Sequence, residues 1–95
     1  MSTRVVYAGT FDPFTIGHLS IVDKVAQLFD EVIILFADNE AKNRRFDKDK
    51  MIEAVQETLR EYGLSDHVIV RHYDGLTASF CRQNGAVALI RGLEI

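Results

Sequence analysis

Residues 5–18 read VVYAGTFDPFTIGH, and within this stretch the pattern of a buried strand gives way to that of a helix. Residues 5–9 are apolar and rich in β-branched side chains, and Asp12 and Pro13 just after them indicate a turn. From Thr15 onward, apolar side chains recur at helical spacing and predict a helix with a wide buried face. Its apolar positions are Leu19, Ile21, Val22, Val25, Ala26, Leu28 and Phe29. We therefore expect a strand, a turn and a helix, the first unit of an α/β fold.

The rest of the chain is predicted to alternate strands and helices in the same way. Strands are predicted at residues 31–37, 68–70 and 87–90, and helices between residues 47 and 63 and between 75 and 85. The strands lack the in-out alternation of a half-exposed sheet. The order β-α-β-α-β-α-β predicts an α/β fold, a Rossmann-like parallel sheet with helices on both faces. We expect it to form one domain over residues 1–95.

Ligands in open parallel sheets bind beyond the carboxyl ends of the strands. This rule selects residues 9–18, 37–46, 73–76 and 91–95 as the segments in which a functional site is expected. The first of these segments joins the first strand to the first helix, and its residues are the most informative.

Segment 9–18 combines features that suit the binding of an anion. Gly9 permits an unusual backbone conformation or the close approach of a ligand. Thr15 can cap the helix, and Gly17 leaves room beside its first turn. His18 lies in that turn, where N–H groups and the helix dipole attract phosphate. One interpretation is therefore an anion site with room for a polyphosphate. The alternative is a tight turn with a solvent-facing histidine, which the Gly-His pair by itself favours.

Composition and charge bound the classes of function. Eleven Lys and Arg residues against 14 Asp and Glu residues give a net charge of −3, which does not favour a nucleic-acid or anionic-membrane binder. No apolar run approaches the roughly 20 residues that span a bilayer, and the first residues lack a signal-peptide pattern. The single cysteine, Cys81, cannot form an intrachain disulfide. We expect a cytoplasmic protein with no nucleic-acid or membrane partner.

The tetrapeptide Thr15-Ile16-Gly17-His18 resembles the (His/Thr)-x-Gly-His marker of a nucleotidyltransferase superfamily. Within that superfamily, residues 9–13 followed by Thr15 look most like the bacterial phosphopantetheine adenylyltransferases. Lys42, Leu76 and residues 91–93 also fall where that family has Lys, Leu and Arg-Gly-Leu. The resemblance implies transfer of the adenylyl group of ATP to 4′-phosphopantetheine, which gives dephospho-coenzyme A and pyrophosphate with Mg²⁺. It also implies a homo-oligomer, because members of the family are commonly hexamers.

The resemblance implies roles for individual residues. His18 is expected to contact the ATP phosphates and to stabilise the transition state, as the catalytic residue. Phe11, chiefly through its backbone, and Gly92 are expected to bind ATP. The residues expected to bind phosphopantetheine are Thr10, Lys42, Leu76 and Arg91. No residue is assigned as a metal ligand.

Other polar residues near these segments have more modest interpretations. Asp12 is expected to stabilise the turn, or to orient a neighbouring group or bind a metal through water. Arg44 and Arg45 belong to a basic cluster with Lys42, and we expect them to contribute only to the local electrostatic field. If they are exposed, raised salt should weaken that contribution.

Two features depart from the family pattern. The family continues Arg-Gly-Leu with a second arginine that helps to bind nucleotide phosphates, whereas this chain has Glu94. Family members are also longer, so we expect residues 1–95 to be the incomplete first part of a nucleotidyltransferase fold, inactive alone.

Two alternatives stay open. One is an enzyme of the same superfamily with another acceptor, which Thr15 in place of His disfavours. The other is a truncated, non-catalytic nucleotide-binding module, which Glu94 favours.

Overall fold

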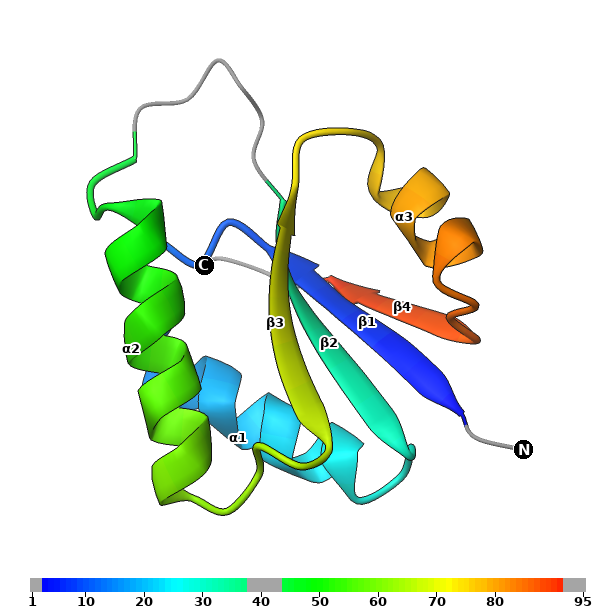
Figure 1. Ribbon diagram of the computed structural model, residues 1–95, viewed down its shortest axis with the longest axis horizontal. Helices are drawn as coiled ribbons and strands as arrows, with labels where there is room; N and C mark the ends of the chain where they lie inside the picture. The colour runs from blue at the N-terminus through cyan, green and yellow to red at the C-terminus, as the bar shows by residue number, and fades with distance from the viewer. Residues whose placement is uncertain (1–2, 38–43, 92–95) are drawn as a thin grey trace.

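The computed structural model describes residues 3–37 and 44–91 and contains a parallel sheet with its helices (Figure 1). The elements are β1 (Arg4–Gly9), α1 (Ile16–Ala26), β2 (Glu31–Ala37), α2 (Lys48–Glu61), β3 (Val68–Tyr73), α3 (Thr77–Gln83) and β4 (Ala88–Arg91). Their order confirms the predicted alternation of strands and helices. Lys42 and Gly92 lie outside the described residues, as does Glu94.

The sheet has the strand order β3-β2-β1-β4, and each neighbouring pair is parallel. From β1 the chain builds outward through β2 to β3, and then crosses back to place β4 on the other side of β1. Right-handed crossovers in opposite directions put their helices on opposite faces, so α1 and α2 cover one face and α3 the other (Figure 1). The predicted Rossmann-like sheet with helices on both faces is confirmed. The reversal of strand order places the switch point between β1 and β4, where ligands of such sheets bind.

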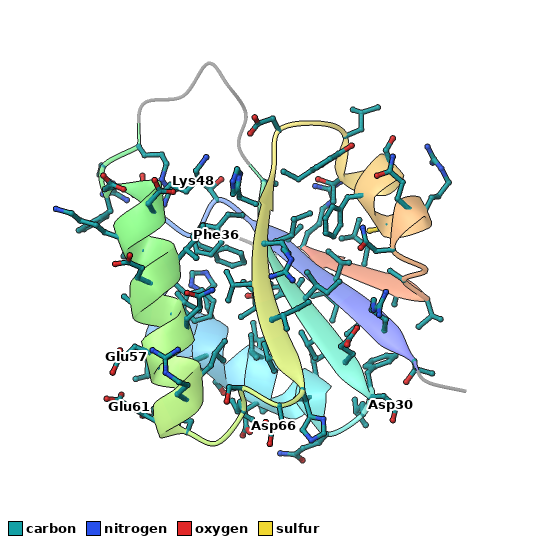
Figure 2. The ribbon with its side chains drawn as sticks, in the orientation of Figure 1. Asp30, Phe36, Lys48, Glu57, Glu61 and Asp66 are labelled. Carbon is teal, nitrogen blue, oxygen red and sulfur yellow. The ribbon has the colours of Figure 1, made fainter. Side chains whose placement is uncertain are left out.

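The larger core lies between the sheet and the helices α1 and α2. Its strand residues come from alternate positions, and both helices contribute to it. The buried members are Val5, Tyr7, Val32, Ile34, Phe36, Val68 and Val70 from the strands, Phe11 from the loop, and Leu19, Val22, Val25, Val55 and Leu59 from the helices. Figure 2 shows Phe36 on the side of the sheet that faces α2. The smaller core packs Val6, Ala8, Ile33 and Leu35 against Phe80 of α3.

The helix ends follow from local sequence, as predicted. The Asp47 carboxylate accepts hydrogen bonds from the backbone N–H groups of Asp49 and Lys50, which caps α2. Gly63, at φ 72°, ends this helix in the left-handed conformation that glycine tolerates best. The N–H of Leu64 then closes the motif with a 2.8 Å bond to the Leu59 carbonyl.

The buried face of α1 is narrower than the sequence predicts. Leu19, Val22 and Val25 are buried, but Ile21 is 41% exposed. Leu28 is 77% exposed because the helix ends at Ala26, so its spacing no longer places it on the inner face. None of the described helices is both long and apolar enough to cross a membrane.

Candidate active site

The sheet topology brings the expected site residues of β1 and β4 to the same edge. Arg91 pairs in register with Ala8, so the end of β4 lies beside Gly9 and Thr10. Thr10 and Arg91 are both exposed there. Leu76, the residue before α3, is 75% exposed in the β3–α3 connection at the same carboxyl edge of the sheet.

Phe11 is the anchor of the β1–α1 loop. Its side chain is only 1% exposed and contacts four other rings. These are Tyr7, Phe14, His18 and Phe36, at centroid distances of 5.3, 5.2, 5.1 and 5.1 Å. Its φ of 50° is the left-handed conformation, which a non-glycine residue adopts only at a cost. Because the ring packs into this cluster, the side chain of Phe11 is not available to a ligand.

His18 closes the first turn of α1 by a reciprocal capping arrangement with Thr15. The backbone N–H of Thr15 donates to Nδ1 of His18 at 2.8 Å, and the backbone N–H of His18 donates to Oγ1 of Thr15 at 3.4 Å. Because Nδ1 accepts a hydrogen bond, the proton of the neutral imidazole lies on Nε2. The rings of Phe11 and Phe14, with centroids 5.1 and 5.3 Å away, restrict its rotation. The half-buried imidazole is therefore fixed in orientation, with a donor at Nε2.

The two glycines of the loop have different steric roles. A Cβ on Gly9 would lie 3.0 Å from Cε1 and Cζ of Phe11, so this glycine makes room for the Phe11 ring. The sequence had suggested an unusual conformation or close approach of a ligand, but the close neighbour is a side chain of the chain itself. A Cβ on Gly17 would meet only Thr15 Oγ1, at 3.5 Å. Nothing in the described residues therefore requires glycine at position 17, which fits the expectation that it leaves room for a ligand.

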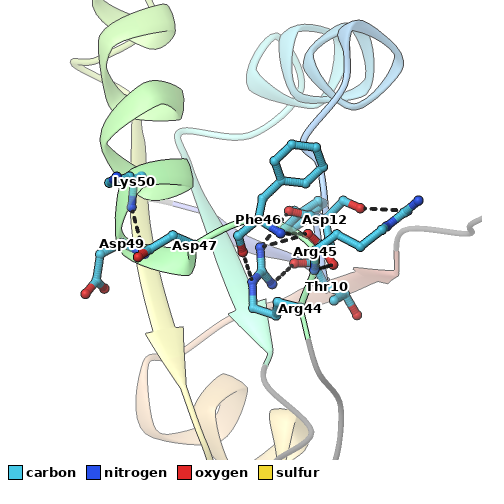
Figure 3. A network of polar contacts seen from close by, with 9 residues as sticks. Thr10, Asp12, Arg44, Arg45, Phe46, Asp47, Asp49 and Lys50 are labelled. Atoms are coloured by element: carbon cyan, nitrogen blue, oxygen red, sulfur yellow. Dashed lines mark hydrogen bonds and ion pairs between the residues drawn. The ribbon is translucent and has the colours of Figure 1, made fainter.

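Asp12 ties the loop to the segment that leads into α2 (Figure 3). Its carboxylate accepts hydrogen bonds from the backbone N–H groups of Arg45 at 2.7 Å and Phe46 at 2.8 Å. The pKa of Asp12 is lowered, chiefly by the hydrogen bond from the Arg45 N–H. The Phe46 N–H and the charges of Arg44 and Arg45 lower it further, whereas partial desolvation of the carboxylate acts in the opposite direction. Both carboxylate oxygens are thus engaged in stabilising the turn, so Asp12 fits that role rather than a metal ligand.

Arg44 is the site residue that sequence reasoning underestimated. Its guanidinium donates to the carbonyl oxygens of Thr10 at 2.6 Å, Phe11 at 3.0 Å and Phe46 at 3.0 Å. The side chain is 12% exposed, so it is a structural clamp rather than an exposed source of field. Thr10 and Arg44 are 34 residues apart, and no local spacing pattern could have revealed their contact.

Two further observations concern the chemistry of the site. Within the described residues, no group of three or more His, Cys, Asp or Glu side chains could hold a metal ion. The hydroxyl of Tyr7 is buried under the loop and has no hydrogen-bond partner in the part of the chain that the structure describes. Burial raises the pKa of Tyr7, which keeps the phenol neutral.

The arrangement suits the binding of phosphate groups. The switch point combines an exposed hydroxyl on Thr10, a fixed imidazole on His18 and the exposed guanidinium of Arg91. The first turn of α1 adds backbone N–H groups and the positive end of its dipole. These groups can bind and orient anions, and they include no serine or cysteine nucleophile.

A family model for cytidylyltransferase-like proteins matches residues 6–95. The chain is 41% identical over 91 residues to a phosphopantetheine adenylyltransferase from Methylacidiphilum infernorum, covering 96% of this chain and 52% of that protein. It is 43% identical over 94 residues to the enzyme of the same name from Cytophaga hutchinsonii, covering 99% of this chain and 61% of the relative. The chain thus spans between 52% and 61% of the length of these two relatives.

A solved structure supports the fold. A bifunctional NMN adenylyltransferase/ADP ribose pyrophosphatase from Francisella tularensis superposes with a TM-score of 0.67 over 88% of this chain and 25% of that chain. The two sequences are 22% identical, so this likeness concerns the fold alone.

Proposed function

Because the chain belongs to the cytidylyltransferase-like family, we propose that the protein is a phosphopantetheine adenylyltransferase, which transfers the adenylyl group of ATP to 4′-phosphopantetheine. The names of its relatives, at 41% and 43% identity, support this acceptor over others. The observation that carries the proposal is the fixed His18 imidazole, held by Thr15 at the N-terminus of α1 and beside the β1–β4 switch point.

The reaction needs no nucleophile from the protein. An oxygen of the acceptor phosphate forms a bond to the α-phosphorus of ATP, while the bond from that phosphorus to the bridging oxygen breaks and pyrophosphate leaves. Catalysis then consists of holding two anions in line and stabilising the charge that develops on the α-phosphate. The described groups around Thr10, His18 and Arg91 include no serine or cysteine, which is compatible with this chemistry.

His18 is the proposed catalytic residue. Its Nδ1 accepts from the Thr15 N–H, so its Nε2–H is the group proposed to donate to the α-phosphate. The contacts of the imidazole with the Phe11 and Phe14 rings keep this donor in one direction before the substrate binds. Such preorganisation means that no reorientation is required as charge develops in the transition state.

The remaining assignments concern binding. Phe11, through its backbone, and Gly92 are proposed to contact ATP, and Thr10 and Arg91 the phosphate of phosphopantetheine. Lys42 is proposed to share that phosphate, and Leu76, with its exposed side chain, to contact the pantetheine arm. We propose that Mg²⁺ enters with ATP, bound to its phosphates, because the described residues offer no carboxylate cluster for a resident ion.

His18→Gln tests the proposal without removing the helix cap. A glutamine at this position of a capping arrangement can still accept the Thr15 N–H, so the start of α1 should be preserved. In the full-length protein, loss of the imidazole should reduce the single-turnover rate by on the order of 10²–10³ while ATP affinity changes little. Pyrophosphate release with ATP and 4′-phosphopantetheine measures the first quantity, and calorimetric titration of ATP the second.

Two controls make this test specific. His18→Ala removes both the imidazole and the capping acceptor, so it should match His18→Gln in turnover but fall below it in stability. Replacing 4′-phosphopantetheine by nicotinate mononucleotide should give no comparable pyrophosphate release. Near-normal turnover by His18→Gln would contradict the catalytic role, and a preference for the second acceptor would contradict the proposed substrate.

A further inference from the structure

Arg44 makes more contacts to the β1–α1 loop than a general electrostatic role requires. Its Nη1 donates to the carbonyl of Thr10 at 2.6 Å and its Nη2 to the carbonyl of Phe11 at 3.0 Å (Figure 3). Its Nε donates to the carbonyl of Phe46 at 3.0 Å, and its Cζ lies 5.7 Å from the centroid of the Phe36 ring. The planar guanidinium thus spans two successive carbonyls of the loop, a geometry that the single ammonium group of lysine cannot reproduce.

The charge of Arg44 is already compensated within the fold. The nearest carboxylate oxygen of Asp12 is 3.9 Å from Nη2, and both side chains are only 12% exposed. The same carboxylate binds the backbone N–H groups of the two residues that follow Arg44, so it holds the guanidinium segment in place. A buried and compensated cation that is occupied by three carbonyls is poorly suited to bind a substrate phosphate directly.

The contacts of Arg44 determine the direction of two peptide groups. In a trans peptide unit the C=O and the following N–H point in opposite directions. With the carbonyls of Thr10 and Phe11 held by the guanidinium, the N–H groups of Phe11 and Asp12 must point away from Arg44. The left-handed φ of Phe11, 50°, makes this backbone conformation costly, so external contacts are needed to keep it.

We propose that Arg44 is a positioning residue that aims the backbone N–H groups of Phe11 and Asp12 at the phosphates of the bound nucleotide. It also withdraws the two carbonyl oxygens, whose partial negative charge would repel phosphate, from the surface that faces the ligand. Arg44 acts through the loop and does not itself touch the substrate. This inference rests on the proposed function, because it assumes that a nucleotide binds at the switch point beside β1.

Arg44→Lys is the decisive variant, because it keeps the positive charge and removes the planar fork. Kinetics in the full-length protein should show a KM for Mg-ATP raised about tenfold, as expected for loss of charge-assisted hydrogen bonds. The KM for 4′-phosphopantetheine should change less than twofold, since the acceptor does not use these N–H groups. Arg44→Gln should behave like Arg44→Lys. Methylguanidinium added to Arg44→Ala should restore part of the ATP affinity.

Two charge-removing variants serve as controls. Arg45→Gln removes the neighbouring charge and the 3.0 Å hydrogen bond from Arg45 Nη2 to the Asp12 carbonyl, whose peptide group has no N–H because Pro13 follows. It leaves the contacts of Arg44 in place. Arg60→Gln removes an exposed charge on α2 that pairs with Glu57. Both should keep the KM for Mg-ATP within twofold of the unmodified protein. Near-normal kinetics of Arg44→Lys, or equal effects of Arg44→Gln and Arg45→Gln, would overturn the inference in favour of a field effect. A parallel rise of both KM values, or a loss of kcat alone, would overturn it in favour of a merely structural role.

A measurement without ligand separates this inference from the proposed function. Amide hydrogen exchange and amide chemical shifts of Phe11 and Asp12 should change in Arg44→Lys and remain unchanged in Arg60→Gln. Unchanged amides in Arg44→Lys would overturn the positioning role whatever the protein catalyses. If the unmodified protein transfers no adenylyl group, the proposed function fails; if it also binds no Mg-ATP, the role of Arg44 toward a nucleotide fails with it.

Discussion

Gly9→Ala tests whether the aromatic cluster around Phe11 is rigid. The new Cβ would lie 3.0 Å from two ring atoms of Phe11 and 3.4 Å from a third, which is closer than side chains ordinarily pack. The ring has no free space into which it could move, because it is 1% exposed and contacts Tyr7, Phe14, His18 and Phe36. The substitution should therefore displace the ring or strain the loop.

Two opposing effects determine how much the free energy of unfolding changes in Gly9→Ala. Overpacking a filled core costs about 1–3 kcal/mol. Replacing glycine by alanine also restricts the unfolded chain, which returns about 0.4–1 kcal/mol. The free energy of unfolding of Gly9→Ala should therefore fall by about 1–2 kcal/mol, and the melting temperature by roughly 4–8 °C for each kcal/mol in a domain of this size.

Urea and thermal unfolding, followed by circular dichroism, measure this change. Gly17→Ala is the matched control, because its Cβ would have only an ordinary 3.5 Å contact and lies in the first turn of a helix. It should raise stability by up to about 1 kcal/mol. Adding Phe11→Leu to Gly9→Ala should recover part of the packing strain. Unchanged or increased stability of Gly9→Ala would show that the Phe11 ring can move to make room for the new Cβ, and that the aromatic cluster is not rigid.

Two other substitutions test the buried polar groups of the same region. Tyr7→Phe removes a buried hydroxyl that has no partner among the described residues, so we expect unfolding free energy to rise by about 1 kcal/mol; a fall, measured by urea unfolding, would reveal a hydrogen bond to that hydroxyl. Asp12→Asn should destabilise the protein at pH 7. The pKa of Asp12 is lower in the folded chain than its ordinary value of 3.8, so its contribution is complete above about pH 5 and is lost as the pH falls through 3.8 and below. The free energy of unfolding, measured from pH 7 to pH 3, should therefore fall more steeply in the unmodified protein than in Asp12→Asn. Parallel curves for the two proteins would contradict this role of Asp12.

Much of the fold could be predicted because its signals are local. The apolar run at residues 31–37 becomes β2, which is buried on both faces. Asp47 and Gly63 mark the ends of α2 because capping involves only neighbouring residues along the chain. Apolar spacing predicted burial less well near the end of α1, because the helix ends before Leu28 and leaves this side chain exposed.

The sequence predicted most of the individual residues of the candidate site, but less of how they are arranged in space. Thr15 and His18 are close in sequence, and their reciprocal capping follows from the spacing of a capping box. The position of Arg91 beside β1 follows from the predicted sheet only once the strand order is known. Gly9 was expected to permit an unusual backbone conformation or the close approach of a ligand, and its steric role became evident only from the position of the Phe11 ring.

The sequence alone therefore determined the alternation of strands and helices, the caps, and the loop that carries His18. These features depend on residues a few positions apart, whose interactions leave a periodic or positional pattern. Only the tertiary structure decided that Arg44 and Asp12 hold this loop, although both were visible as charged residues. Their partners are more than 30 residues away, and contacts at that separation exist only after β1 and β2 have paired side by side.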